Sequence, residues 1–203
     1  MNLFNYFKEN IHMDKIKNFT GDTHDMAIVR YVMKEAAKFF YRDYTFFFYK
    51  ENIKDRDDIY NKKIDMEDVK DFAIVCKSYC NVIKEVLKQN YDINSELISP
   101  FDDKFRHVDL LIKTRSGSSY IVDPLTDLIE MQVGMKTNNF ASREYYDSVY
   151  AGKLENISFM KDKELNMIDD KIDYKKNDIY LDDFLKLIRS KLDNIEEILS
   201  KYQ

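Results

Sequence analysis

Four side chains in the middle of the chain can do nucleophilic chemistry if the fold brings them together. Cys76 and Cys80 are the two cysteines of the chain, and His107 and Asp123 follow them at the edges of predicted strands. A thiol attacks as its thiolate, which a neighbouring imidazole can generate. The imidazole in turn needs a carboxylate that holds its tautomer and orientation. A helix-borne cysteine with His107 and Asp123 on neighbouring strands would supply these three roles.

The same residues, taken one at a time, have simpler interpretations. A free cysteine is more often a small core group than a nucleophile. His107 alone would be a half-buried strand residue, and Asp123 alone a turn former before Pro124. A zinc site needs about four ligands, whereas the chain offers two cysteines and three histidines without the usual spacings. The Cys-x-x-x-Cys spacing also differs from the Cys-x-x-Cys redox motif, so we predict neither a metal nor another cofactor.

The pattern of apolar residues predicts helices around these four residues and strands between them. Residues 1–22 form a polar lead-in that can hold a short helix, and residues 25–40 have helical spacing with Thr23 or Asp25 as the N-cap. A second helix runs from the cysteines to about residue 90. Candidate strands cover 94–99, 107–114, 119–122 and 156–160, and one apolar stripe over 181–201 is typical of an amphipathic helix. Helices, then antiparallel strands, then a helix indicate an α+β fold.

The turn between the strands at 107–114 and 119–122 decides whether His107 and Asp123 can meet. Side chains alternate along a strand, so an odd number of turn residues places the two side chains on the same sheet face. Residues 115–118 give a four-residue turn in which Gly117 is free to take positive φ. A four-residue turn places His107 and Asp123 on opposite faces. The triad therefore requires a three- or five-residue turn, or a bulge at Gly117.

Length and composition are those of one folded domain. With 203 residues, 44% of them hydrophobic, the chain can bury one substantial core, and we predict a single domain over 1–203. A net charge of -5 with both signs interspersed argues against a nucleic-acid partner. No stretch is long and apolar enough for membrane insertion, and the N-terminus lacks a secretory signal of the usual kind. We expect a cytoplasmic protein, or one exported without a Sec-type signal.

Residues 74–127 resemble the core of the transglutaminase-like superfamily of cysteine enzymes. The segments VCKSYCNVIKEVL, INSELIS and HVDLLIKTRSGSSYIVDPLTD follow the order of its bacterial members. In those members a Val-Cys-x-Gly-Tyr-Ala start leads into a helix and a strand. A His-Ala-Trp strand, a turn with glycine and a strand ending in Asp-Pro-Thr or Asp-Val-Thr follow. The matching positions are Val75, Cys76, Tyr79, His107, Gly117, Asp123 and Pro124.

The resemblance implies a papain-like α+β fold in which the nucleophile helix packs on an antiparallel sheet, with additional N- and C-terminal helices. It implies Cys76 as nucleophile at a helix N-terminus, where the helix dipole favours a thiolate. His107 would be the base and Asp123 the orienting residue. Cys80 stands where the family has a small packing residue.

The chain also departs from the family pattern. Ser78 replaces the usual glycine, and Val108-Asp109 replaces Ala-Trp. Asp109 has the same strand parity as His107, so a second carboxylate near the imidazole would either raise its pKa or disturb its pairing with Asp123. The chain has no tryptophan to help the Cys76 backbone N–H hold an oxyanion, which leaves Tyr41 and Tyr44 as candidates.

The residues and the resemblance together predict a thiol enzyme that acts on a protein or peptide amide through an acyl-thioester. Water as acceptor gives proteolysis or glutamine deamidation, and an amine acceptor gives transamidation; the sequence leaves these open. By analogy, the setting would be a bacterial hydrolase or a translocated effector. The alternatives are a non-catalytic transglutaminase-like binding domain, and a helical scaffold that pairs with a partner through the 181–201 stripe.

Overall fold

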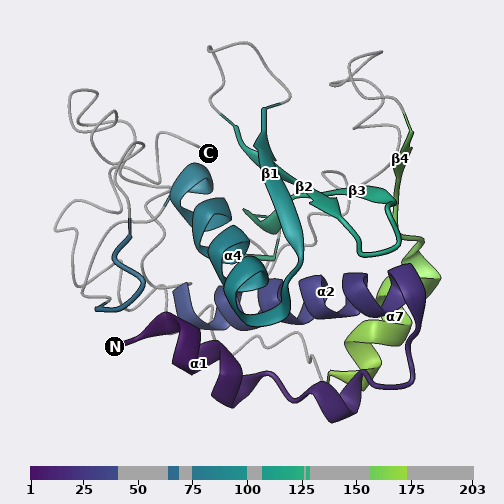
Figure 1. Cartoon of the computed structure of the whole chain (residues 1–203), viewed down its shortest axis with the longest axis horizontal. Coiled ribbons are helices and arrows are strands. Elements are labelled where there is room, and N and C mark those ends of the chain that lie inside the picture. Colours follow the sequence, from purple (N-terminus) through teal and green to yellow (C-terminus); the bar gives the residue numbers. More distant parts are fainter. Residues whose placement is uncertain (41–63, 69–74, 100–106, 126, 129–155, 173–203) are drawn as a thin grey trace, which may run out of the picture.

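A computed structural model describes residues 1–40, 64–68, 75–99, 107–125, 127–128 and 156–172. In chain order the elements are α1 (Leu3–Asn10), a 3-10 turn η1 (Met13–Lys15), α2 (Gly21–Phe40), α4 (Cys76–Tyr91), β1 (Asn94–Ile98), β2 (Asp109–Lys113), β3 (Ser119–Val122), β4 (Ile157–Ser158) and α7 (Asp162–Lys171). Helix α4 packs against β1 and β2, and α2 contacts α1, α4 and α7 (Figure 1). The predicted α+β class is confirmed.

The sheet is mixed, with strand order β1-β2-β3-β4. Strands β1, β2 and β3 pair antiparallel in sequence, as predicted. Strand β4 instead pairs parallel to β3, with Ser119 opposite Ile157 and Tyr120 opposite Ser158. The prediction of a wholly antiparallel sheet is therefore wrong at this edge. Parallel pairing needs a crossover connection, and residues 123–156 are long enough to provide one.

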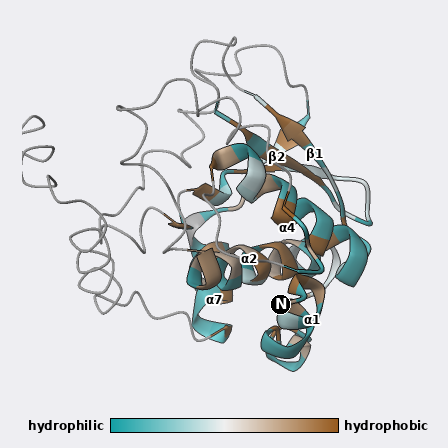
Figure 2. Ribbon diagram, turned by 90° about the vertical axis from the view of Figure 1, so that its left-hand side faces the viewer, coloured by the Kyte–Doolittle hydropathy of each residue, from teal (hydrophilic) through white to brown (hydrophobic). Residues whose placement is uncertain are grey.

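Helix α2 lies at the centre of the helical layer and is buried around most of its circumference. Helical spacing gives this helix an apolar face of which Ile28, Tyr31, Val32 and Ala36 are at most 2% exposed, whereas Phe39 is partly buried. Many residues outside this face are buried as well, which is typical of a helix surrounded by other elements. Hydrophobic positions concentrate between α2, α4 and the sheet, and hydrophilic positions lie on the outer turns (Figure 2).

The N-terminal lead-in contributes to the core. Its short helix, α1, buries Leu3 and Phe7 completely. The side chain of Asn2 accepts a hydrogen bond from Asn5 N at 3.1 Å and so caps the helix. The short helix predicted for this segment is thus present and packs against α4 and α2.

The turn between β2 and β3 has five residues, because Lys113 pairs with Ser119 and residues 114–118 lie between them. The predicted four-residue turn is wrong, since β2 ends one residue earlier than the sequence pattern suggested. Gly117 has a φ of 94°, as its position in the turn predicted. An odd turn places His107 and Asp123 on the same side of the sheet, so the register allows them to meet.

Helix α2 begins at Gly21, so the predicted start at residue 25 and the predicted N-cap at Thr23 or Asp25 are wrong. Asp25 instead accepts hydrogen bonds from Arg115 N and Arg115 Nε, each at 2.8 Å. Asp22 accepts from the hydroxyls of Thr114 and Ser118, each at 2.6 Å. The first turns of α2 therefore anchor the β2–β3 turn, and the two carboxylates are used across the fold rather than within the helix.

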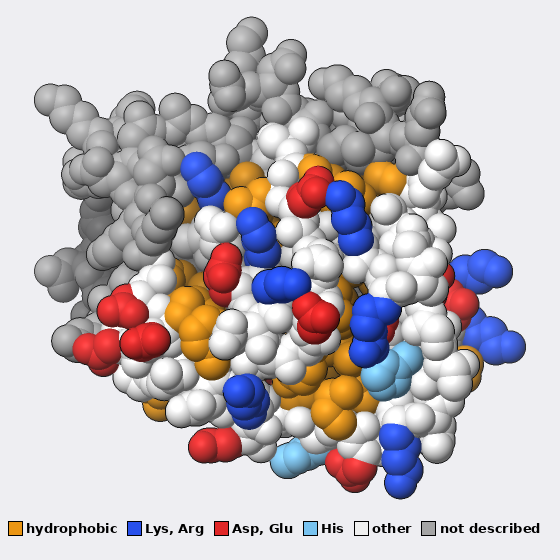
Figure 3. Space-filling view, viewed as in Figure 1, with side chains coloured by type: hydrophobic (Ala, Val, Ile, Leu, Met, Phe, Trp, Pro, Cys, Tyr) orange, Lys and Arg blue, Asp and Glu red, His pale blue; other side chains and the backbone are white. Residues whose placement is uncertain are grey.

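On the face shown in Figure 3, lysine and arginine side chains are interspersed with aspartate and glutamate. None of the helices in the described ranges is both long and apolar enough to cross a membrane. The stripe predicted over 181–201 and the candidate oxyanion residues Tyr41 and Tyr44 lie outside the described residues.

Candidate active site

Cys76 is the first residue of α4, as the family resemblance implied. Val75 before it is extended, with φ -132° and ψ 169°. The hydroxyl of Ser78 accepts from Val75 N at 2.9 Å and donates to Val75 O at 3.0 Å. A glycine at this position could form neither bond. Ser78 therefore closes the backbone around Cys76 with its side chain.

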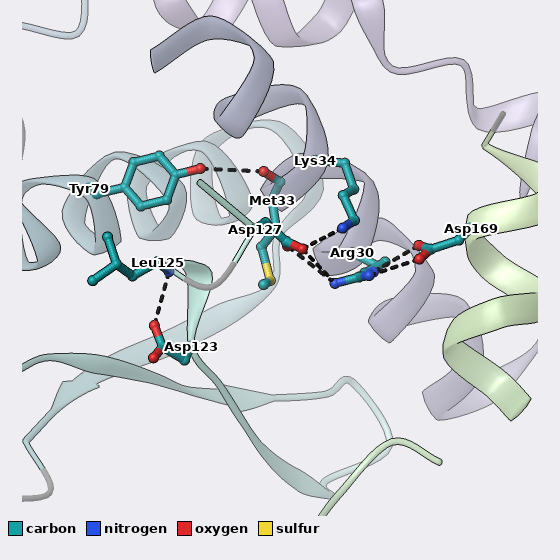
Figure 4. A network of polar contacts seen from close by, with 8 residues as sticks. All are labelled: Arg30, Met33, Lys34, Tyr79, Asp123, Leu125, Asp127 and Asp169. Carbon is teal, nitrogen blue, oxygen red and sulfur yellow. Dashed lines mark hydrogen bonds and ion pairs between the residues drawn. The ribbon is translucent and has the colours of Figure 1, made fainter. Parts of the chain in front are cut away.

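Tyr79 fixes this end of α4 to α2. Its side chain is fully buried, and its hydroxyl donates to Met33 O at 3.4 Å (Figure 4). Its ring meets Phe40 edge-on, with the centroids 6.0 Å apart. The Cys76 thiol, itself 9% exposed, thus begins a helix whose first turn is held against the central helix.

His107 and Asp123 form a direct pair. Nε2 of His107 lies 2.8 Å from Oδ2 of Asp123, while Oδ1 of Asp123 accepts from Leu125 N at 2.9 Å (Figure 4). The backbone of His107 is held by Ser99, whose hydroxyl donates to His107 O at 2.8 Å. His107, predicted to open a strand, lies two residues before β2 begins. Asp123, predicted to close a strand, lies one residue after β3 ends. The structure therefore brings together the two residues assigned as base and orienting group.

Asp109 reaches the same imidazole nitrogen. Its Oδ1 lies 3.1 Å from Nε2 of His107, and its side chain is 1% exposed. The β2–β3 ladder pairs Leu110 with Val122, and one further step would place Asp109 opposite Asp123. The second carboxylate that strand parity predicted is thus at the imidazole, and the His107–Asp123 pair is retained beside it.

The Cys76 thiol and both carboxylates act on His107 together. Burial alone would lower the pKa of His107, but hydrogen bonds with Asp109, Asp123 and Cys76 raise it well above its ordinary value. The charge of Asp123 acts in the same direction. These contacts favour the charged form of the imidazole.

Cys80 differs from Cys76 in its surroundings. It is completely buried, and its thiol donates to Val108 O at 3.3 Å. Burial raises the pKa of Cys80 well above its usual range, and the charges of Asp123 and Asp109 raise it further. Cys80 is therefore placed as a protonated packing group, which agrees with the small residue that the family has at this position.

The segment that follows Asp123 is anchored by a buried ionic network that the sequence analysis did not predict. Arg30 donates to Asp127 at 3.1 and 3.2 Å and to Asp169 of α7 at 2.8 Å through two nitrogens (Figure 4). Lys34, 1% exposed, also binds Asp127. Burial would raise the pKa of Asp127, yet Arg30 and Lys34 hold it below its usual range. Arg30 and Lys34, two cations four residues apart among the mostly apolar residues 26–37 of α2, were the available signal.

A small hollow of about 70 Å³ lies beside this network. Asp123 and Arg30 are its charged lining residues, and neither Cys76 nor His107 lines it. Its other walls are apolar: Met26, Val29, Met33, Ile121, Val122, Phe159, Met160 and Leu165. The hollow therefore borders the orienting residue and not the thiol, and we assign it no substrate.

The side chains of His107, Asp109 and Asp123 also form a group with the chemistry of a metal site, because one ligand atom from each lies within 4.8 Å of the others. Both carboxylates converge on one nitrogen, at 2.8 and 3.1 Å. The contact with Asp123 is a hydrogen bond, and the contact with Asp109 lies within ion-pair distance of the same nitrogen. We therefore describe the group as a hydrogen-bonded cluster.

No protein-family model, no curated protein and no solved structure matches this chain. The transglutaminase-like resemblance therefore depends on the motif residues themselves.

Proposed function

We propose that the chain is a cysteine-dependent amide hydrolase or acyltransferase that uses Cys76, His107 and Asp123. One observation carries the proposal: the imidazole of His107 lies 2.8 Å from the buried carboxylate of Asp123, which follows β3, and the Cys76 thiol at the start of α4 contributes to the raised pKa of the same imidazole. The start of α4, the residue before β2 and the residue after β3 would thus supply the three groups that pass the proton. A thiol, an imidazole and a carboxylate in this order are the parts that thiol acyl transfer requires.

In the proposed reaction, Sγ of Cys76 attacks an amide carbonyl carbon after its proton has passed to His107. The C–N bond then breaks, and the imidazolium returns the proton to the departing amine, leaving an acyl-thioester. Water or a second amine attacks the thioester and releases the thiol. The N-terminus of α4 favours negative charge at Cys76, and Asp123 stabilises the imidazolium. Protein or peptide substrates follow from the resemblance, and the acceptor decides between proteolysis, deamidation and transamidation.

Alkylation of the two thiols tests the proposal without a substrate. Iodoacetamide is applied near neutral pH, followed by trypsin, which separates the cysteines because Lys77 lies between them. The peptides DFAIVCK and SYCNVIK then report Cys76 and Cys80 separately. We expect Cys76 to react at least about tenfold faster than Cys80, and a His107→Gln change to slow Cys76 strongly.

The control outcomes are equally direct. Equal, slow labelling of both thiols would overturn the enzyme and favour the non-catalytic binding domain. Prior treatment with EDTA should leave Cys76 labelling unchanged, because the proposed site uses a proton and no metal. Mass spectrometry of candidate protein substrates, treated with the native chain or with Cys76→Ser, would identify the reaction as a cleavage, a deamidation or an amine adduct.

A further inference from the structure

Two carboxylates lie within ion-pair distance of the same nitrogen of His107, which is more than a single orienting residue requires. Asp123 Oδ2 and Asp109 Oδ1 lie 2.8 Å and 3.1 Å from Nε2. A single carboxylate is enough to fix the tautomer of an imidazole. The second one therefore calls for a function of its own.

We propose that Asp109 is a second positioning residue: together with Asp123 it keeps a proton on Nε2 of His107, which leaves Nδ1 to take up the Cys76 proton and favours the imidazolium that results. This inference deepens the proposed function and rests on it. Asp109 contacts neither the thiol's target nor the departing amine in this scheme, and it acts through His107.

The two carboxylates are held in different ways. Asp123 follows β3 and is oriented by Leu125 N, which donates to its other oxygen at 2.9 Å. Asp109 is the first residue of β2, and its direction is fixed by the strand that pairs on both sides, with β1 and with β3. Loss of either carboxylate therefore leaves the other in place, and the proton on Nε2 keeps an acceptor.

The charges around His107 agree with this division of roles. Among the residues that the structure describes, the titratable groups that act on it are Cys76 from α4, Asp109 from β2 and Asp123 just after β3. Cys80, also from α4, lies near both carboxylates and is held protonated by burial. An opposite charge within about 4–6 Å favours a charged group by roughly 1–3 pKa units. Each aspartate thus stabilises the charged form of the imidazole independently of the other.

The imidazole can be observed directly by two-bond ¹H–¹⁵N NMR, which reports both protonation and tautomer. The experiment uses the Cys76→Ala chain, so that the Cys76 thiol does not titrate with the imidazole. We expect His107 to remain doubly protonated at pH 8, above the ordinary imidazole pKa of about 6.5. In Cys76→Ala with Asp109→Asn, we expect His107 to titrate about 1–3 units lower while the neutral form keeps its proton on Nε2.

A matched control removes a carboxylate from the same sheet without touching the imidazole. Glu96→Gln on β1, whose side chain is 58% exposed, should leave the His107 titration where it is. An unchanged titration in Asp109→Asn would overturn the inference. If Asp109→Asn does not fold, a neutral His107 at pH 8 in the Cys76→Ala chain would overturn it as well. Slow labelling of Cys76 would instead count against the proposed function, so the two failures are distinguishable.

Discussion

The chemistry proposed for this chain depends on one side chain, His107, because every other candidate group acts on it. In the proposed reaction Cys76 loses its proton to His107, and the carboxylates of Asp123 and Asp109 lie next to Nε2 of the same imidazole. Cys80 contacts the same strand through Val108 O and stays outside this set. The two thiols lie one helical turn apart in α4, and their different surroundings lead us to expect different reactivities.

This separation predicts that Cys80→Ala keeps the reactive thiol. The change removes the contact with Val108 O and a small buried volume, so the free energy of unfolding should fall by about 1 kcal/mol. The labelling rate of Cys76 should stay within about twofold of the native rate, since Cys80 is not its base. Urea denaturation and the tryptic labelling assay measure the two effects. If Cys80→Ala slowed labelling as much as His107→Gln, Cys80 would belong to the reacting set.

The residues of the candidate site could be predicted from the sequence because their order and spacing follow a chemical pattern. Cys76, His107, Asp123 and the nearby Asp109 all occupy one part of the fold. The role of Ser78 could not be predicted, because a serine in place of a glycine does not reveal that its hydroxyl binds both backbone groups of Val75. Such bonds depend on the local backbone path and not on residue type.

At the level of elements, the candidate site depends on the contacts that α2 makes with α4, with the β2–β3 turn and with the segment after Asp123. Tyr79 attaches the start of α4 to α2, and Asp127 attaches the segment after Asp123 to Arg30 and Lys34 of the same helix (Figure 4). The carboxylates Asp22 and Asp25 attach the β2–β3 turn. Helix α2 therefore supports the elements that carry the proposed triad and supplies none of its residues.

Asp127→Asn should strongly destabilise the fold. The change keeps the shape of the side chain but leaves the buried Lys34 without its counter-charge, and breaking a buried ion pair costs about 3–5 kcal/mol. Chemical denaturation at neutral pH measures the loss. Asp92→Asn is the matched control, because Asp92 pairs with Lys88 at the surface, with 82% of its side chain exposed, and its removal should leave the midpoint nearly unchanged. Equal midpoints for the two variants would contradict the supporting role of the network.

The elements were predictable to different degrees for physical reasons. Strand β3 matches the predicted range 119–122, and the helix that begins at Cys76 matches to within a residue, because their apolar periodicity is strong. The start of α2 was misplaced because Asp25, which resembles an N-cap in the sequence, lies inside the helix and binds Arg115 of the β2–β3 turn. Strand β4 pairs parallel to β3, from which it is distant in sequence, and no local sequence pattern specifies such a partner.

Across the whole molecule, the proton shared by thiol and imidazole should be visible in the pH dependence of stability. The pKa of His107 is raised in the folded chain, so its contribution is fully present below the unfolded value of about 6.5 and is lost as pH rises toward the folded value. In Cys76→Ala no thiol at position 76 titrates, so the loss of the His107 contribution is observed without it. The free energy of unfolding should therefore fall by about 1 kcal/mol per pH unit between pH 7 and 8.

The native chain should behave differently over the same interval. If folding moves a proton from Cys76 to His107, the folded and unfolded chains bind equal numbers of protons until the unfolded thiol titrates near its pKa of about 8.5, and the slope should nearly vanish. Urea midpoints of the native chain, of Cys76→Ala and of Cys76→Ala with His107→Gln, measured at each pH, separate the two contributions. A flat profile for Cys76→Ala would show that His107 is neutral when folded, and a native slope equal to that of Cys76→Ala would show that the thiol keeps its proton.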